Sequence, residues 1–313
     1  MTWARLIRFT DDSGRTTFGD PCIGNCDDLI TLLNQQELFA IRLLGNDPFA
    51  LARTTEKIRV RRLLAVLTED DVAVIKCIGL NYRKHIAETG RKPPPYPSLF
   101  MKPAPAIAGF NSDISVAPIA QDKNLDYEGE LAVVIGETGK NISVEDAISY
   151  VAGYASSNDV SARTWQRDPA FAGSVPQWSY AKSFDSFAPL GPMLVSPSVA
   201  GAADHLRLQT LVNGEIRQDS NTADLLFDVA HLVSFLSQGS TLQRGTVIMT
   251  GTPDGVALGM PDPKPWLQHG DVVEVRIELL GSCVNKVVYE STEPGPLASS
   301  SPLSDSAADA SRM

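Results

Sequence analysis

Two carboxylates, Glu128 and Glu130, stand two residues apart in the stretch LDYEGELAVVIG. The apolar, β-branched run Leu131–Ile135 follows them and ends at a glycine, which predicts a buried strand. Residues i and i+2 of a strand point to the same face, so the two acids would project side by side next to a core. Like charges in a low dielectric both stay ionised only when a cation compensates them.

A divalent metal ion is the simplest source of that compensation. Carboxylate oxygens suit hard ions, so the pattern predicts Mg²⁺, with Mn²⁺ and Ca²⁺ as alternatives. The competing interpretation is a solvent-facing strand end with scattered acids, which the spacing alone does not exclude. Residues 151–157 predict a strand of small residues that leads into Asn158 and Asp159. Asp159 is therefore a third carboxylate at a strand end, placed where it could reach the first two.

A possible helix over Tyr82–Glu88 carries a second chemical pattern. His85 and Glu88 stand at i and i+3, on one face of such a helix. A carboxylate beside an imidazole orients the ring and raises its basicity, as a general base requires. An exposed surface helix is the alternative. Gly79 precedes the segment and Gly90 with four prolines follows it, so we interpret it as a candidate lid.

Two further positions could meet an anionic ligand. Lys182 stands among small and apolar residues, either as a structural residue that extends its amine to solvent or as a charge directed at a ligand. Gly251 and Thr252 belong to a glycine-rich turn whose backbone N–H groups could bind an anion. A plain type I turn at Thr252-Pro253-Asp254-Gly255 explains the same residues.

The composition restricts the class of partner. The chain has 313 residues and a net charge of −10, so we expect neither a nucleic acid nor an anionic membrane surface as partner. No apolar run in it has the length that spans a membrane, and we expect no secretory signal. We expect a cytoplasmic protein with four reduced cysteines, and a mitochondrial location stays open.

The elements that would position these residues are predominantly strands. Residues 3–9 predict a strand followed by a hairpin, whereas 28–43 and 49–67 have helical or mixed periodicity. Asn213-Gly214 predicts a second hairpin, and residues 225–236 predict a helix. Further expectations are a helix over 143–150, a proline-bearing loop over 165–180, two antiparallel strands over 269–290 and a disordered Ser/Ala-rich tail over 291–313.

Five segments in order resemble the fumarylacetoacetate hydrolase superfamily, over about residues 3–290: CIGLNYRKHIAE, LFMKPAPAIAG, DYEGELAVVIG, NDVSARTWQ with WSYAKSFDSFAPLGP, and VIMTGTPDGV with HGDVVEV. Within this superfamily the chain looks like the fumarylacetoacetate hydrolase domain-containing proteins, which include acylpyruvases, oxaloacetate decarboxylases and oxaloacetate tautomerases. The resemblance implies a mixed α/β, β-rich fold and a homodimer. It implies a small N-terminal subdomain (1–70) followed by a catalytic domain (71–290) with the β-roll of the fumarylacetoacetate hydrolase superfamily.

The resemblance also implies residue roles. The metal ligands would be Glu128, Glu130 and Asp159, holding Mg²⁺ or Mn²⁺. The candidate catalytic residues are His85, Glu88 and Lys182, and the candidate substrate-binding residues are Arg163, Gln166, Gly251 and Thr252. The chain departs from the family pattern at Thr164, at Ala257-Leu258-Gly259 and in the long 165–180 loop. These departures concern the substrate pocket, so they leave the substrate's identity open.

The implied function is metal-dependent chemistry on a 2-oxo acid, either a 2,4-dioxo or a 3-carboxy acid, through a stabilised enolate. C–C bond hydrolysis or decarboxylation is the first expectation, because both His85 and Glu88 are present. Keto–enol tautomerisation of oxaloacetate-like acids is the alternative, together with hydration or dehydration of an unsaturated 2-oxo acid. The intact acid triad and the His–Glu pair argue against a non-enzymatic scaffold.

Overall fold

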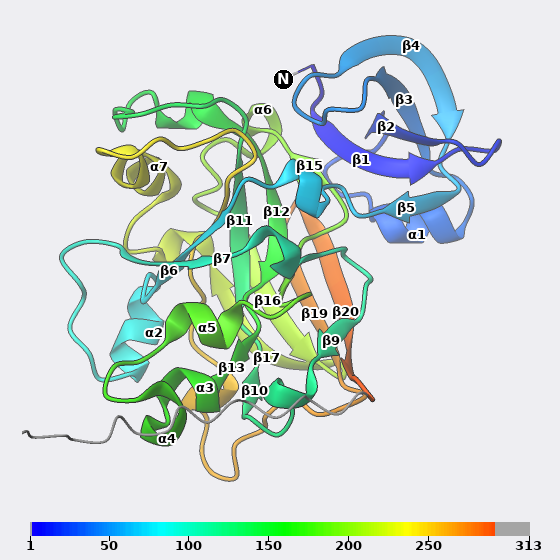
Figure 1. Ribbon diagram of the computed structural model, residues 1–313. Coiled ribbons are helices and arrows are strands. Elements are labelled where there is room, and N and C mark those ends of the chain that lie inside the picture. The colour runs from blue at the N-terminus through cyan, green and yellow to red at the C-terminus, as the bar shows by residue number, and fades with distance from the viewer. Residues whose placement is uncertain (1, 292–313) are drawn as a thin grey trace, which may run out of the picture.

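The computed structural model describes residues 2–291 and has the expected mixed α/β, β-rich fold. The predicted tail lies outside these residues apart from its first residue. Within the described chain, no helix combines the length and the apolarity needed to cross a membrane. Figure 1 shows the N-terminal strands at one end of the molecule and the remaining strands and short helices beside them.

An eleven-stranded sheet runs through both parts, in the order β4-β3-β2-β1-β15-β12-β11-β18-β6-β7, with β5 also paired to β1. Its strands are β1 (Arg5–Thr10), β2 (Thr16–Pro21), β3 (Phe39–Leu44), β4 (Ala52–Arg59), β5 (Arg62–Leu64), β6 (Ile75–Gly79), β7 (Ser98–Lys102), β11 (Gly129–Ile135), β12 (Val151–Asn158), β15 (Leu194–Val195) and β18 (Val247–Met249). β11 and β12 therefore lie near the middle of the hydrogen-bonded order.

A five-stranded sheet contains the predicted Asn213-Gly214 hairpin and the predicted C-terminal strand pair. Its order is β17-β16-β19-β20-β9, with β9 (Ile114–Val116), β16 (Arg207–Val212), β17 (Glu215–Asn221), β19 (Val272–Ile277) and β20 (Gly281–Tyr289). Two-stranded pairs join β10 (Leu125–Asp126) to β13 (Ser161–Ala162) and β8 (Ile107–Ala108) to β14 (Ala188–Pro189). The helices are α1 (Leu29–Asn34), α2 (Arg83–Glu88), α3 (Arg163–Arg167), α4 (Pro169–Ala172), α5 (Trp178–Lys182), α6 (Pro197–Ala200) and α7 (Val229–Ser237).

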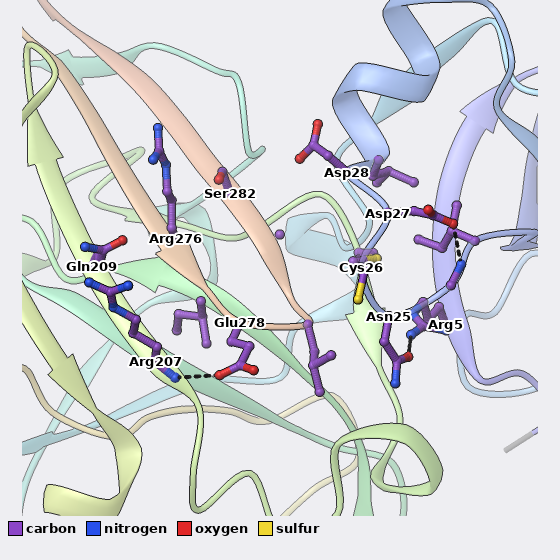
Figure 2. A pocket seen from close by; sticks show the side chains of 17 residues that line it. Arg5, Asn25, Cys26, Asp27, Asp28, Arg207, Gln209, Arg276, Glu278 and Ser282 are labelled. Carbon is purple, nitrogen blue, oxygen red and sulfur yellow. Dashed lines mark hydrogen bonds between the residues drawn. The ribbon is translucent and has the colours of Figure 1, made fainter.

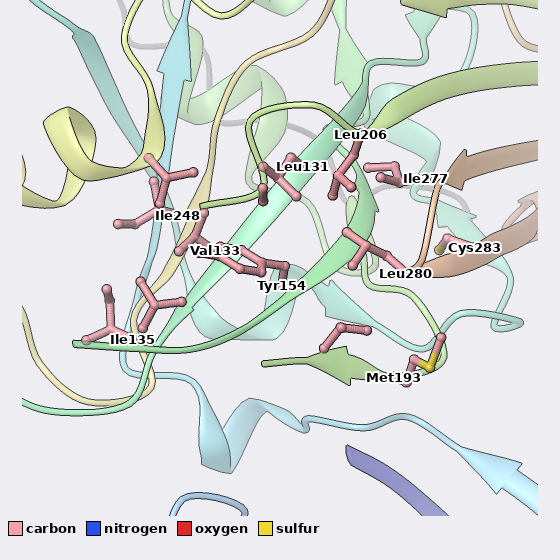
Figure 3. Close-up of a cluster of buried hydrophobic side chains, with 14 of the residues drawn as sticks. Leu131, Val133, Ile135, Tyr154, Met193, Leu206, Ile248, Ile277, Leu280 and Cys283 are labelled. Atoms are coloured by element: carbon pink, nitrogen blue, oxygen red, sulfur yellow. The ribbon is translucent and has the colours of Figure 1, made fainter. Parts of the chain in front are cut away.

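β11 is buried along its whole length because both of its faces are covered. Leu131, Val133 and Ile135 contribute to one hydrophobic cluster, which Figure 3 shows. Ala132 and Val134 contribute to the cluster on the opposite face. Alternate residues of this apolar run therefore pack into two different cores, one on each face of the sheet. This is the arrangement that the predicted buried strand requires.

Several sequence-based assignments were wrong. Residues 28–43 contain one short helix and then β3, and 49–67 contain β4 and β5 in place of helical structure. The N-terminal strands pair with one another, and this long-range pairing outweighs the weak helical periodicity. Only Ala147–Tyr150 of the helix expected over 143–150 is helical, as a 3₁₀ turn. α7 begins at Val229, four residues later than expected at Leu225, because the Asp228 side chain caps it.

The N-terminal strands continue the larger sheet. β1 pairs with β2 on one side and with β15 on the other, with Arg5 opposite Val195 and Leu6 opposite Leu194. Val195 also pairs with Tyr154 of β12. The boundary at residue 70 between a small N-terminal subdomain and a catalytic domain stays a prediction. The larger sheet contains hydrogen-bonded strands from both sides of that boundary.

Candidate active site

The three predicted metal carboxylates converge at one end of the β11–β12 pair. Gly129 pairs with Asn158 and Glu130 with Ser157, and the Asp159 N–H donates to the Glu128 carbonyl oxygen at 2.8 Å. One carboxylate oxygen from each of Glu128, Glu130 and Asp159 lies within 4.8 Å of the others. All three side chains are buried, so the acids face a core and the solvent-facing alternative does not apply.

Two of the predicted site residues are cations that contact this triad directly. Lys182 Nζ lies 2.6 Å from Glu128 Oε2 and 2.6 Å from Asp159 Oδ2. Arg163 forms ion pairs with Glu128 and, at 2.9 Å, with Asp126. Burial opposes ionisation of Glu128, but Arg163 and Lys182 outweigh it and hold the pKa of that carboxyl well below its usual range.

Glu130 is compensated less, because the charge of Lys182 and the Gly251 N–H are outweighed at this carboxyl. Burial, Asp159 and Glu128 together raise the pKa of Glu130 well above its ordinary value. Its Oε2 accepts a hydrogen bond from the Gly251 N–H at 2.7 Å. The predicted substrate-binding residue Gly251 therefore supports a triad carboxylate.

Gly251 adopts φ +97°, and an added Cβ would lie 2.9 Å from the Ile78 carbonyl oxygen. A glycine is thus required both by the backbone conformation and by the close approach of β6. The neighbouring Thr252 Oγ1 donates to the Gly129 carbonyl oxygen at 3.1 Å and accepts from Gln218 Nε2 at 2.8 Å. These bonds hold the glycine-rich turn against β11.

Sequence reasoning missed two charged residues at the triad. Lys102 Nζ lies 2.5 Å from Asp159 Oδ1 and donates to the Phe187 carbonyl oxygen at 2.5 Å. Asp126 accepts from Arg163 Nε at 2.9 Å and from the backbone N–H groups of Ala257 and Leu258 at 2.9 and 3.2 Å. Lys102 and Asp126 lie inside two of the resembling segments, and that position was the only signal for them.

A cavity of about 520 Å³ opens onto the triad. His85, Glu88, Arg163, Gln166, Lys182 and Thr252 line it together with Glu128 and Glu130. The structure thus gathers the predicted residues around one space, with Asp159 and Gly251 behind its wall.

The predicted His–Glu pair lies on α2 at the cavity wall. His85 Nδ1 is 3.1 Å from Glu88 Oε2, and this hydrogen bond is the main reason why the pKa of Glu88 is lowered. Glu88 also fits closely against Gly259, where an added Cβ would lie 2.5 Å from Glu88 Oε1. The departure from the family pattern at Ala257-Leu258-Gly259 therefore lies beside this pair.

Residues 165–180 contain parts of three short helices joined by irregular chain, where a loop was expected. α3 follows directly from β13 and carries both Arg163 and Gln166, whose side chains are joined by a 3.0 Å hydrogen bond. α5 ends with Lys182 and begins with Trp178, which stacks edge-on against Phe100. The segment is thus a wall of the cavity that also delivers Lys182 to the triad.

A second cavity, of about 540 Å³, lies between residues 23–29 and the ends of β16, β19 and β20 (Figure 2). Its two arginines on the sheet are already paired, Arg207 with Asp219 at 2.6 Å and Arg276 with Glu274 at 2.5 Å. None of the predicted catalytic, metal or substrate-binding residues lines it. The cavity at the triad is therefore the candidate active site.

The triad fits a hard divalent cation. It offers three carboxylates and no nitrogen or sulfur ligand, which suits Mg²⁺ or Mn²⁺. Burial and the negative charges of Asp159 and Glu128 raise the pKa of Glu130, and the nearby Lys182 does not offset them. Glu128, Glu130 and Asp159 are accordingly the residues that would hold the ion.

Comparison with known proteins gives a consistent result. The sequence model of the fumarylacetoacetate hydrolase C-terminal domain matches residues 74–288. Over 222 residues the chain is 44% identical to a fumarylacetoacetate hydrolase domain-containing protein 2 homolog of Dictyostelium discoideum, covering 68% of this chain and 70% of the relative. It is 40% identical over 225 residues to mitochondrial oxaloacetate tautomerase Fahd2a of Rattus norvegicus, covering 72% and 69%.

Solved structures agree with the fold. A 2-hydroxyhepta-2,4-diene-1,7-dioate isomerase from Mycobacterium marinum superposes with a TM-score of 0.72 at 31% identity, covering 92% of this chain and 100% of the isomerase. A fumarylpyruvate hydrolase from Pseudomonas aeruginosa, solved with Mn²⁺ and pyruvate, superposes with a TM-score of 0.61 at 34% identity, covering 70% and 91%.

Proposed function

Because the chain belongs to the fumarylacetoacetate hydrolase family, we propose that it is a metal-dependent enzyme that converts a 2-oxo acid through its enolate. Keto–enol tautomerisation of an oxaloacetate-like acid is the reaction we favour. The observation that carries the proposal is the buried triad of Glu128, Glu130 and Asp159 facing a cavity that also holds His85. The rat relative's name, an oxaloacetate tautomerase, supports this choice of reaction.

The triad would hold Mg²⁺ or Mn²⁺, which supplies Lewis-acid polarisation of the 2-oxo group when bound. Lys182 brings a buried positive charge to the same place. Burial opposes that charge, but Asp159 and Glu128 outweigh it and raise the pKa of Lys182, so it stays an ammonium group. Its charge would favour a substrate as negative charge develops on it.

His85 is the candidate for moving the proton. Glu88 Oε2 accepts from Nδ1 if that nitrogen carries the hydrogen, which leaves Nε2 as the basic atom. A positioned base of this kind contributes on the order of 10²–10⁴ in rate. The exposed fractions of the two side chains, 12% and 26%, leave the pair in reach of a ligand in the cavity.

C–C bond cleavage is the second candidate, by hydrolysis or decarboxylation. The His85–Glu88 contact favours it, because the same oriented base could activate water. The fumarylpyruvate hydrolase with a similar fold supports this alternative. Hydration or dehydration of an unsaturated 2-oxo acid is a weaker alternative that only the initial resemblance supports.

The test separates these reactions on the purified protein. Oxaloacetate and acetylpyruvate are each supplied with Mg²⁺ or with EDTA, and enol absorbance and pyruvate release are recorded separately. We expect EDTA-sensitive loss of the enol signal of oxaloacetate without pyruvate above the spontaneous rate. EDTA-sensitive pyruvate release would instead establish C–C cleavage. Full activity in EDTA would contradict the metal assignment.

Two expectations of assembly and location accompany the proposal. A homodimer is predicted from the resemblance, and light scattering of the purified protein tests it. A cytoplasmic location also stays a prediction, and imaging of the tagged protein with a mitochondrial marker tests it.

A further inference from the structure

One glutamine of the five-stranded sheet contacts the segment that carries two of the triad acids. Gln218 lies on β17, and only 1% of it is exposed. Its Oε1 accepts a hydrogen bond from the Gly129 N–H at 3.0 Å. Its Nε2 donates to Thr252 Oγ1 at 2.8 Å and to the Pro253 carbonyl oxygen at 3.0 Å. The buried amide therefore uses its oxygen on β11 and both of its hydrogens on the glycine-rich turn.

These contacts close a ring of three hydrogen bonds. Thr252 Oγ1 accepts from Gln218 and donates to the Gly129 carbonyl oxygen at 3.1 Å, so the ring returns to the residue at which it starts. Gly129 stands between Glu128 and Glu130 in the sequence. Side chains from β17 and from the glycine-rich turn therefore hold the N–H and the carbonyl group of the residue that separates the two acids.

The five-stranded sheet packs closely against Gly129. An added Cβ at Gly129 would lie 2.0 Å from Thr210 Oγ1 of β16 and 3.2 Å from Gln218 Oε1 of β17. The first residue of β11 thus lies directly against two strands of the other sheet. Because the packing is this close, the hydrogen bonds of Gln218 also determine where the Gly129 backbone lies.

Side chains of β12 hold the peptide groups on either side. The Glu128 N–H donates to Asn158 Oδ1 at 3.0 Å, and Ser157 Oγ donates to the Glu130 carbonyl oxygen at 2.9 Å. β12 pairs with β11, so these two bonds belong to the larger sheet. Gln218 acts between these two points and connects them to the five-stranded sheet.

A firmly held backbone matters here because the triad acids repel one another. Glu128, Glu130 and Asp159 are buried, and one carboxylate oxygen of each lies within 4.8 Å of the others. In a low dielectric, like charges at this distance favour moving apart when no ion lies between them. Residues that orient metal ligands in advance therefore contribute to metal affinity.

We propose that Gln218 is a positioning residue of the metal site, which holds Gly129 so that Glu128 and Glu130 keep the spacing that a divalent ion requires. The inference rests on the proposed function, since it assumes that the triad binds Mg²⁺ or Mn²⁺. Gln218 is not among the residues that line the cavity at the triad. It acts through Gly129 and Thr252, and it contacts neither the ion nor the substrate.

Mn²⁺ affinity tests this role without requiring turnover. Gln218→Met removes the amide and keeps the length of the side chain. Gln209→Met is the matched control, because Gln209 lies on neighbouring β16, lines the second cavity and donates to Asp219 at 3.1 Å. Leu208→Ala removes a buried side chain of the same sheet and controls for a general loss of stability. Electron paramagnetic resonance of added Mn²⁺ gives each affinity, at a temperature below the unfolding transition of every variant.

We expect Gln218→Met to weaken Mn²⁺ binding roughly tenfold, which is the usual size of the effect when a residue that supports metal ligands is lost. Gln209→Met and Leu208→Ala should bind Mn²⁺ within about twofold of the unaltered protein, because neither removes a group that supports the triad. Normal Mn²⁺ affinity in Gln218→Met, or an equal loss in Leu208→Ala, would overturn the role.

Variants of Thr252 test whether the ring acts as a unit. Thr252→Val keeps the shape and removes the hydroxyl group, so it should weaken Mn²⁺ binding roughly tenfold, whereas Thr252→Ser should retain the affinity. Thr252→Val combined with Gln218→Met should add little, since the ring is already open. A combined loss of about a hundredfold would show independent effects and overturn the ring. If Gln218→Met does not fold, Thr252→Val decides alone, and its normal Mn²⁺ affinity would overturn the proposal.

These measurements separate failure of this role from failure of the proposed function. If the unaltered protein binds no Mn²⁺, both are wrong. If the Mn²⁺ affinities follow the expected pattern but EDTA does not change the conversion of oxaloacetate, the role of Gln218 stands and the proposed reaction is wrong. If tautomerisation is sensitive to EDTA and Gln218→Met binds Mn²⁺ normally, the reaction stands and the role of Gln218 is wrong.

Discussion

Glu88 Oε2 lies 3.1 Å from Nδ1 of His85, and the two residues are one helical turn apart on α2. The contact lowers the pKa of Glu88, so the carboxylate stays charged and can orient the imidazole throughout the neutral range. The pair lines the cavity without belonging to the acid triad, so the proposed proton transfer and the proposed metal binding would use different residues.

This separation predicts that His85→Ala spares metal affinity and removes proton transfer. We expect Mn²⁺ affinity to stay within about twofold, while any C–C cleavage falls on the order of 10²–10⁴. Tautomerisation should fall less if another group or water can exchange the proton. Glu88→Gln, which keeps a hydrogen-bonding side chain, should have an intermediate effect. Equal losses of Mn²⁺ affinity and rate would show that His85 belongs to the metal site.

Glu128→Gln should abolish metal binding and activity together. The change removes the charge that Arg163 and Lys182 share and leaves both cations facing the remaining acids. Electron paramagnetic resonance of added Mn²⁺ measures the free ion directly. Glu137→Gln, an exposed position just beyond β11, is the matched control and should bind Mn²⁺ normally. Full activity of the Glu128 variant would refute the assignment of the ligand.

Glu130 predicts a pH-dependent stability of the metal-free protein. Its pKa is raised well above the ordinary 4.5, so the folded state holds this proton more tightly than the unfolded chain does. Raising the pH from 4.5 toward the raised pKa therefore lowers the free energy of unfolding.

Glu130→Gln removes that titration. In EDTA the variant should melt a few degrees above the unaltered protein at about pH 7.5, with the difference lost near about pH 4. Added Mg²⁺ should reverse the order, because only the unaltered protein gains the binding energy. Melting curves at both pH values test this, and a less stable variant in EDTA at neutral pH would contradict it.

Gly251→Ala tests the close approach of the glycine-rich turn to β6. The added methyl group meets the Ile78 carbonyl oxygen, in addition to the strain of the positive φ. Gly214→Ala is the control, since its φ is +81° but no atom lies within 4 Å of the added Cβ. We expect denaturant unfolding to show a loss for Gly251→Ala that exceeds the control by about 1–3 kcal/mol. Mn²⁺ affinity should fall as well, because the Gly251 N–H supports Glu130.

Local patterns predicted the parts of the site that depend on local geometry. The period of two placed Glu128 and Glu130 beside a buried strand, and the helical spacing of three placed His85 next to Glu88. The convergence of Asp159 followed from its place at the end of the neighbouring strand.

Contacts between distant segments could not be predicted in this way. Lys102 reaches Asp159 because β6, β7 and the residues before β14 pack around it, and no spacing in the sequence reports that contact. The N-terminal strands were mistaken for helical segments for the same reason. β3 and β4 are stabilised by pairing with each other, and their own periodicity is weak.

The pairing of Val195 has a consequence for motion. This residue lies opposite Arg5 of β1 on one side and opposite Tyr154 of β12 on the other, and Asp159 follows directly after β12. Fraying of the N-terminal strands would leave β15 unpaired on one side and expose the backbone amides next to β12 to exchange with solvent. Slow amide hydrogen exchange in β1 would therefore indicate that β12, the strand before Asp159, also opens rarely.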